Sequence, residues 1–339
     1  MSIVYFSKRI DAEIVWKIYS RISETVTGKI GIKLHFGEPG NRNYLNPDLL
    51  KILARQINPV LVETNVLYLG PRRETSSHLQ VAKEHGFDFA PVHIMDAEGE
   101  FSLPFTGGKH FQEVRLPRGI ELYDSFIIYS HFKGHMLSGF GGAIKNVGMG
   151  MASIPGKMAQ HSSTIPTTKP KLCINCGLCQ EECPGQAISL EPLKIDPELC
   201  IGCGKCIGVC PQKVFSINWG STTAMIFQER LVEYAKMISQ GRNMVYINVI
   251  GNVSSLCDCD MGAPAPFVND IGIVASTDMV AIDKASLDLV NARSGKKDAF
   301  ARHSRISGNH QLEYASEIGL GSLNYQLIDI SENEFDSET

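Results

Sequence analysis

Eight of the ten cysteines lie within 38 residues, between Cys173 and Cys210, and their spacing repeats. The two copies are Cys173-Ile-Asn-Cys176-Gly-Leu-Cys179-Gln-Glu-Glu-Cys183-Pro184 and Cys200-Ile-Gly-Cys203-Gly-Lys-Cys206-Ile-Gly-Val-Cys210-Pro211. Every cysteine recurs after 27 residues, so the segment is an internal duplication. The shared pattern, C-x2-C-x2-C-x3-C-P, is a spacing with which thiolates hold iron–sulfur clusters. Since the first 172 residues contain no cysteine, this clustering indicates metal binding rather than a disulfide framework.

The spacing also predicts which cysteines share a cluster. Three thiolates on one tight loop reach three irons of a cubane, and the fourth, followed by proline, leaves along a short helix toward the other cluster. One 4Fe–4S cluster is therefore assigned Cys173, Cys176, Cys179 and Cys210. The second 4Fe–4S cluster is assigned Cys200, Cys203, Cys206 and Cys183. Zinc is disfavoured because four-ligand zinc sites usually pair two C-x2-C units.

The segment from Thr168 to Asn218 resembles a bacterial-type dicluster ferredoxin domain over its whole length. The resemblance implies two fully ligated 4Fe–4S clusters that pass electrons between a donor and an acceptor. The alternative is that the clusters only stabilise a small fold. Because the segment contains five acids and five lysines, its charge does not indicate steering of a partner by a broad electrostatic field.

Histidines and lysines stand together before the cysteine segment. In His131-Phe-Lys133-Gly-His135, alternate residues share one face if the chain is extended. A glycine-rich stretch with Lys145 follows, Gly139-Phe-Gly-Gly-Ala-Ile-Lys145-Asn, and we interpret it as a loop whose amides and lysine point at an anion. The stretch falls short of a dinucleotide-binding fingerprint.

A second unusual group is Cys257-Asp258-Cys259-Asp260, shortly after a predicted strand. Ligand sites in open α/β sheets lie at the carboxyl ends of strands. Cys257 and Cys259 are therefore candidates either for a third metal site, together with His131, His135 or His161, or for a redox-active pair. The alternative is that they are free cysteines beside a solvated turn.

Weaker candidates complete the set. Lys33 and His35 alternate at the end of a predicted strand, although a lone histidine is more often structural. Lys157 and His161 lie in a proline-rich stretch. The remaining histidines have no motif beside them and are predicted to be structural: His78, His85, His93, His110, His303 and His310.

Several of these strings together resemble a known family. They are Lys33-Leu-His-Phe-Gly-Glu-Pro-Gly, Ser130-His-Phe-Lys-Gly-His, Gly139-Phe-Gly-Gly-Ala-Ile-Lys-Asn-Val-Gly-Met-Gly and Cys257-Asp-Cys259. The chain is similar over nearly its whole length to uncharacterised iron–sulfur-centre proteins, domain-of-unknown-function family 362. The resemblance implies one α/β domain with an inserted ferredoxin repeat, and it implies no particular reaction.

Strands alternate with helices on both sides of the cysteine segment. The pattern predicts strands at residues 3–6, 30–36, 60–63, 92–95 and 125–129, and again at 244–250, 271–275 and 325–330. Helices are predicted at residues 12–22, 46–57, 74–85, 223–238 and 278–290, with Asp278 as an N-cap. Such alternation is typical of an α/β fold with a mainly parallel sheet and helices on both faces.

The predicted organisation is one α/β domain interrupted by a small α+β ferredoxin-like dicluster domain. Its parts are residues 1–167, the insert 168–218, residues 219–330, and an acidic tail at 331–339 that we expect to be frayed. Residues 153–170, rich in proline, serine and threonine, are predicted to be a connection. The pattern does not show that the two flanks share a sheet, so a tandem of three units stays open.

Composition limits the classes of function. The net charge of −4 and a pI near 6.2 give no support to nucleic-acid binding. No apolar run approaches the roughly 18 residues of a membrane span, and the N-terminus does not have the order of a secretory signal. We therefore expect a cytoplasmic protein, in a low-oxygen setting because exposed cubanes are oxygen-sensitive.

Three functions fit these observations. The first is an electron carrier, whose partner is a redox protein or a small-molecule acceptor. The second is a redox enzyme whose α/β domain binds a small anion or an extra metal and receives electrons from the insert. Its candidate residues are Lys33, His35, His131, Lys133, His135, Lys145, Cys257 and Cys259. The third is a scaffold in which the clusters are structural.

Overall fold

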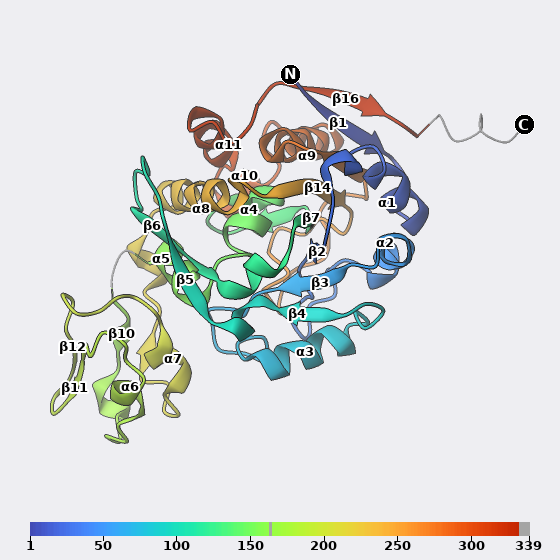
Figure 1. Ribbon diagram of the computed structural model, residues 1–339. Coiled ribbons are helices and arrows are strands. Elements are labelled where there is room, and N and C mark those ends of the chain that lie inside the picture. The colour runs from blue at the N-terminus through green and yellow to red at the C-terminus, as the bar shows by residue number, and fades with distance from the viewer. Residues whose placement is uncertain (163–164, 332–339) are drawn as a thin grey trace, which may run out of the picture.

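The computed structural model describes residues 1–162 and 165–331, and in these residues eight strands form one central sheet. In their order across the sheet, the strands are β16 (Tyr325–Asp329), β1 (Ser2–Ser7), β15 (Gly272–Ser276), β14 (Asn243–Ile250), β7 (Ser125–His131), β2 (Ile30–Lys33), β3 (Val60–Glu63) and β4 (Val92–Ile94). The strands that precede and follow residues 168–218 thus share one sheet (Figure 1). The predicted acidic tail lies, apart from Ser331, outside the described residues.

The sheet is mainly parallel. β14, β7, β2, β3 and β4 form a continuous parallel block, and β1 pairs with β16 in parallel. β15 lies between β14 and β1 and is antiparallel to both. Since parallel strands end at the same edge, the carboxyl ends of β14, β7, β2 and β3 lie next to one another.

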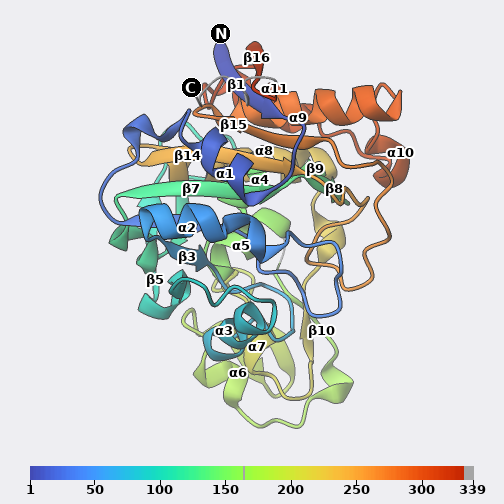
Figure 2. The same ribbon diagram turned by 90° about the vertical axis from the view of Figure 1, so that its right-hand side faces the viewer.

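Helices cover both faces of this sheet (Figures 1 and 2), so the predicted fold class is confirmed. On one face pack α1 (Ala12–Tyr19), α2 (Lys51–Ile57) and α3 (Thr75–Glu84). On the other pack α4 (Ala143–Gly148), α8 (Ala224–Ser239), α9 (Met279–Ser294) and α11 (Asn309–Glu317). Alternate residues of β7 belong to opposite cores, because successive side chains of a strand point to opposite faces: Phe126 and Ile128 lie in the core under α8, Ile127 and Tyr129 in the other.

Capping explains where two of the predicted helices begin. The Asp278 carboxylate accepts hydrogen bonds from the Val280 and Ala281 amides, as its predicted role requires. Thr223 caps α8 in the same way, through the amide of Ile226. Within the described part of the chain, none of the helices has the length and apolar character needed to cross a lipid bilayer.

The structure corrects the prediction that residues 153–170 only connect. Helix α5 (Ile154–His161) lies in this stretch, with Pro155 at its start and the Ser153 hydroxyl accepting from the Gly156 amide. Proline favours the first helical turn, where its missing N–H costs nothing. Two hairpins were also not predicted, β5 (Glu100–Pro104) with β6 (Glu113–Pro117) and β8 (Lys133–His135) with β9 (Gly139–Gly141).

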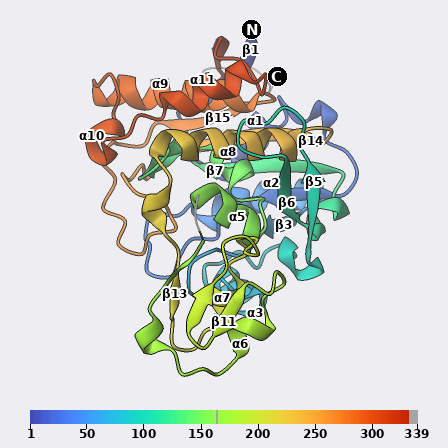
Figure 3. The same cartoon turned by 90° about the vertical axis from the view of Figure 1, so that its left-hand side faces the viewer.

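Residues 168–218, which we call the cysteine segment, lie outside the large sheet and protrude at the end of the molecule opposite β1 and α11 (Figure 3). The segment contains α6 (Leu178–Glu181), α7 (Lys205–Val209) and the hairpin β11 (Ile188–Leu190) with β12 (Leu193–Ile195). Strand β13 (Phe215–Ser216) pairs with β10 (Thr167–Thr168) where the segment joins the rest of the chain. A small apolar core of its own includes Cys179, Cys206 and Phe215, together with Leu67 and Met158 from outside the segment.

Candidate functional site

A pocket of about 660 Å³ lies at the carboxyl ends of the central strands. Lys33 is the last residue of β2, Glu63 the last of β3 and His131 the last of β7, and all three line the pocket. The loop after β14 contributes Cys257 and Cys259. This position is the usual ligand site of an open parallel sheet.

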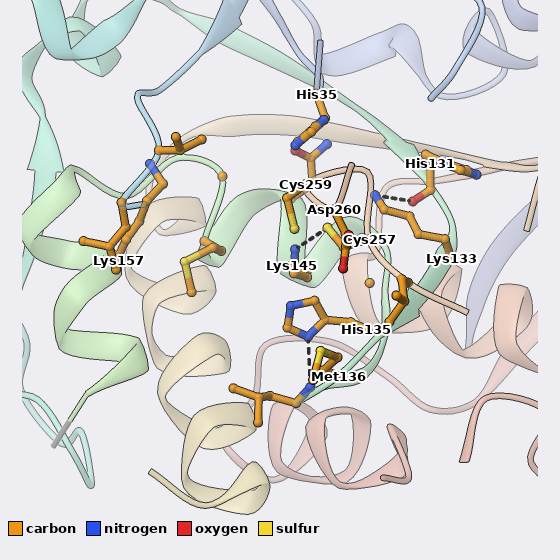
Figure 4. Close-up of a pocket in the computed structure, with 18 of the residues that line it drawn as sticks. His35, His131, Lys133, His135, Met136, Lys145, Lys157, Cys257, Cys259 and Asp260 are labelled. Carbon is orange, nitrogen blue, oxygen red and sulfur yellow. Dashed lines mark hydrogen bonds between the residues drawn. The ribbon is translucent and has the colours of Figure 1, made fainter. Parts of the chain in front are cut away.

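The pocket brings together the predicted site residues outside the cysteine segment (Figure 4). They are Lys33, His35, His131, Lys133, His135, Lys145, Lys157, His161, Cys257 and Cys259. In the close-up, Lys145, Cys257, Cys259 and His135 lie together, with Lys157 across the pocket from them. Residues from before and after the cysteine segment therefore form one site.

The first cluster of charges joins Lys33, Glu63 and Arg72. The Lys33 ammonium lies 2.8 Å from Glu63 Oε1 and donates to Asn146 Oδ1, and Arg72 Nη1 lies 3.4 Å from Glu63 Oε2. Arg72 Nε donates to Glu38 over 2.8 Å. Burial opposes ionisation of Glu63, but Lys33 and Arg72 together hold its pKa below its usual value.

A second cluster joins His131, Lys133 and Asp258. His131 Nδ1 lies 2.8 Å from Asp258 Oδ1, and Nε2 lies 2.8 Å from the Gly251 carbonyl oxygen. Both partner atoms are hydrogen-bond acceptors. Lys133 Nζ lies 3.3 Å from the other Asp258 oxygen. Burial acts to raise the pKa of Asp258, but His131 and Lys133 outweigh it and lower that pKa strongly.

The third cluster is Cys257, Cys259 and Lys145. Lys145 Nζ donates to Cys257 Sγ over 3.4 Å. The neighbouring Cys259 and the ammonium of Lys145 lower the pKa of Cys257, and Cys257 and burial raise the pKa of Cys259. These shifts favour the thiolate at Cys257 and the thiol at Cys259.

Three pocket histidines are held neutral. Burial lowers the pKa of His35 and His135, and nearby cations lower both further. In each, Nδ1 accepts hydrogen bonds, from the Gly37 amide in His35 and from the Ser138 amide in His135. Burial also lowers the pKa of His161 to about 3.

Lys157 is a buried amine on the far side of the pocket. Its hydrogen-bond partners are a hydroxyl and a carbonyl, Thr64 Oγ1 at 2.6 Å and the Ala152 oxygen at 2.7 Å. Burial lowers its pKa to about 8, so its charge changes just above neutral pH.

The glycine-rich stretch does not point its amides at a ligand as predicted. These residues form β9 and the start of the short helix α4, and the amides of Ala143 and Ile144 donate to the Asp283 carboxylate at 2.7 and 2.9 Å. A side chain at Gly142 would collide with this carboxylate, since its Cβ would lie 2.3 Å from Asp283 Oδ1. Asp283 satisfies these two amides of the helix start, and Gly141, Gly142 and Lys145 of the stretch line the pocket.

Several lining residues were not predicted: Glu63, Tyr68, Arg72 and Trp219. Glu63 is the last residue of a predicted strand, so its place at the end of a strand, the feature noted for Lys33, could have identified it. Arg72 follows Gly70-Pro71 in a loop and has no motif. The histidines predicted to be structural are absent from the pocket lining.

Within the cysteine segment, Cys173, Cys176, Cys179 and Cys210 line one small cavity. Burial raises the pKa of Cys179, and the charges of Cys210, Cys173 and Cys176 raise it further.

Burial likewise raises the pKa of Cys206 to about 12, and the charges of Cys203, Cys200, Cys183 and Cys179 add to the shift. Thiolates are the ligands that 4Fe–4S clusters require, and the division of these eight cysteines between two clusters stays a prediction. Across residues 1–162 and 165–331, no group of three or more His, Cys, Asp or Glu side chains is arranged around a single ion.

The pocket and the cysteine segment share a wall. Leu67 lines the pocket and also packs in the apolar core that contains Cys206. Next to it, Arg73 donates to the Leu67 carbonyl oxygen and, over 3.2 Å, to the Gly204 carbonyl oxygen. The loop that carries Cys203 and Cys206 is thus attached directly to the pocket wall.

Comparison with family models adds to this geometry. The model of the family described as Domain of unknown function (DUF362) matches residues 30–288. The chain belongs to this family. The match spans β2 to α9, including the pocket residues and the cysteine segment of the DUF362 chain.

The searches of curated proteins and of solved structures add little to the family match. A search of curated proteins found no match to the DUF362 chain. Among solved structures, it is similar to the lactate racemase apoprotein from Thermoanaerobacterium thermosaccharolyticum, with 12% sequence identity and a TM-score of 0.44. The similarity covers 85% of this chain and 57% of that one, so the chain spans little more than half the length of that protein.

Proposed function

We propose that this protein is a redox enzyme that passes electrons from two 4Fe–4S clusters in the cysteine segment to a small anionic substrate in the pocket. The observation that carries the proposal is the shared wall, in which Leu67 lines the pocket and packs in the core around Cys206. An electron at the Cys183, Cys200, Cys203 and Cys206 group then has a short route to the pocket.

The charges of the pocket favour an anion. Five basic side chains line it, Lys33, Arg72, Lys133, Lys145 and Lys157, against the two lining carboxylates Glu63 and Asp260. Asp258 and Glu38 lie behind the wall and balance part of this excess. The hydrogen-bond partners of Lys145 and Lys157 are the Cys257 sulfur, a hydroxyl and a carbonyl oxygen rather than carboxylates, so a bound anion can take their place.

In this proposal the lysines bind the substrate and the histidines supply protons. Each cluster, when bound, supplies one electron. Lys145 and Lys157 hold the anion from opposite sides. His135 and His35 are neutral and accept through Nδ1, so Nε2 carries a proton that either ring can donate to a reduced substrate.

An electron carrier is the second candidate, and exposed apolar side chains favour it. Leu172, Ile174 and Leu178 are 47%, 61% and 41% exposed, around the exposed Cys176. Such a patch beside a cluster suits contact with a redox protein. In the enzyme, the same patch would serve as the electron entry.

The test measures the rate at which reduced clusters are reoxidised. Photoreduced holoprotein is mixed anaerobically with each of several small anionic acceptors, namely nitrite, sulfite, 2-oxo acids and carboxylated disulfides. Reduction bleaches the visible absorbance of the clusters, and the return of that absorbance is followed over time. We expect one class to reoxidise the clusters with saturation, about tenfold more slowly in Lys145→Met because a charge-assisted contact is lost. The exposed Lys297→Met is the matched control. Equal rates in all three proteins would contradict the enzyme and favour the carrier.

A further inference from the structure

We propose that Cys257 and Cys259 are a catalytic dithiol pair that reduces a small anionic disulfide by thiol–disulfide exchange, with Cys257 attacking and Cys259 resolving. This inference rests on the proposed function for the electrons that regenerate the pair. It adds the residues that react and the chemical class of the substrate.

The backbone holds the two thiols together. Residues 257–260 form a turn in which the Asp260 amide donates to the Cys257 carbonyl oxygen over 2.9 Å. The loop is fixed from outside, since Asn41 Nδ2 donates to the Asp260 carbonyl oxygen at 2.8 Å and the Glu38 amide to that of Asp258 at 3.1 Å. The pair thus has a stable position in the pocket wall.

The two sulfurs differ in environment. Cys257 is buried and accepts from Lys145 Nζ at 3.4 Å, whereas Cys259 is partly exposed. A thiolate attacks disulfides and a neighbouring thiol resolves the product. The contact with an ammonium therefore identifies Cys257 as the attacking sulfur.

The exchange balances in two steps. The Cys257 thiolate bonds to one sulfur of the substrate disulfide, whose S–S bond breaks to release a thiolate. Cys259 then gives its proton to the thiolate released first and attacks Cys257, which forms the Cys257–Cys259 disulfide and releases the second half as a thiolate. Two electrons, one from each cluster, and one proton return the pair to thiolate and thiol.

Lys145 links the reaction to the charge of the substrate. Once Cys257 bonds to the substrate sulfur, it is no longer a thiolate, and the Lys145 ammonium loses its charged partner. A carboxylate on the bound half can then take the place of that thiolate, because Lys145 also lines the pocket. The pair should therefore prefer anionic disulfides to neutral ones.

The experiment uses the holoprotein under anaerobic conditions, where the eight other cysteines are cluster ligands and protected. The probe is the dianionic aromatic disulfide 5,5′-dithiobis(2-nitrobenzoate), and the neutral 4,4′-dithiodipyridine is its matched control. We expect the wild type to release two thiolates per chain and to keep no adduct. Cys259→Ser should release one and keep the mixed disulfide on Cys257, seen by peptide mass.

The variant Lys145→Met tests the role of the lysine charge. It should slow the reaction with the anionic probe about tenfold relative to the reaction with the neutral probe. The variant Lys145→Arg should restore the preference for the anionic probe. An adduct that persists in the wild type, or equal slowing with both probes, would overturn the inference.

Regeneration separates this inference from the proposed function. Photoreduction should restore two free thiols in the oxidised wild type and not in Cys206→Ser. If thiols react as expected but both proteins regenerate equally, the electron route of the proposed function is wrong. If the clusters reduce another anion while the pair stays inert, only the dithiol inference is wrong.

Discussion

Replacing Glu63 by glutamine should destabilise the protein strongly, because Glu63 lies between two fully buried cations. Its carboxylate contacts Lys33 Nζ at 2.8 Å and Arg72 Nη1 at 3.4 Å, and the side chains of Glu63, Lys33 and Arg72 are 4%, 1% and 0% exposed. Removing one partner of a buried ion pair costs about 3–5 kcal/mol, since the other charge stays buried without compensation.

Such a loss corresponds to a fall of roughly 4–7 °C in the thermal midpoint of a chain of this length. Proteins with bound clusters unfold irreversibly, so the assay compares apparent midpoints at one scan rate by differential scanning calorimetry. Glu98→Gln is the matched control, because Glu98 pairs with His93 over 2.9 Å at a more exposed position. It should cost no more than about 1 kcal/mol. Equal shifts for the two variants would refute the reasoning.

Three further predictions concern the pocket, the clusters and the packing of the sheet. Anion affinity, measured by calorimetric titration with sulfite, should fall as pH rises through about 8, because Lys157 loses its proton there, and Lys157→Met should remove this step. Cys179→Ser and Cys206→Ser should each lower the iron content from about eight to about four per chain and abolish different electron paramagnetic resonance signals. Gly142→Ala should lower the thermal midpoint, since the new methyl group would lie 2.3 Å from Asp283 Oδ1.

The sequence predicted the pocket where position along a strand determines position in space. The rule about strand ends was applied to Cys257 and Cys259, and because Lys33 and His131 also end parallel strands, the same rule accounts for their place beside that pair. Arg72 was missed because it reaches Glu38 and Glu63 only through the path of a loop, which has no periodic pattern. Such a contact depends on tertiary structure and leaves no local pattern.

Strand direction was equally hidden. β15 is buried at all five positions, as a central parallel strand would be, yet it runs antiparallel to both neighbours. An apolar run gives no information on strand direction, because a central strand is buried equally whether it pairs in parallel or antiparallel. The glycine-rich stretch failed for a related reason, since the carboxylate that takes its amides comes from Asp283, about 140 residues later.

The central claim is that two clusters supply electrons to the pocket. Its most direct test is the iron and acid-labile sulfide content of anaerobically purified holoprotein, followed by a reductive titration of the same sample. We predict about eight irons and about eight sulfides per chain, with two one-electron reductions. Far fewer irons, or clusters that accept no electrons, would contradict the electron supply on which the proposed reaction depends.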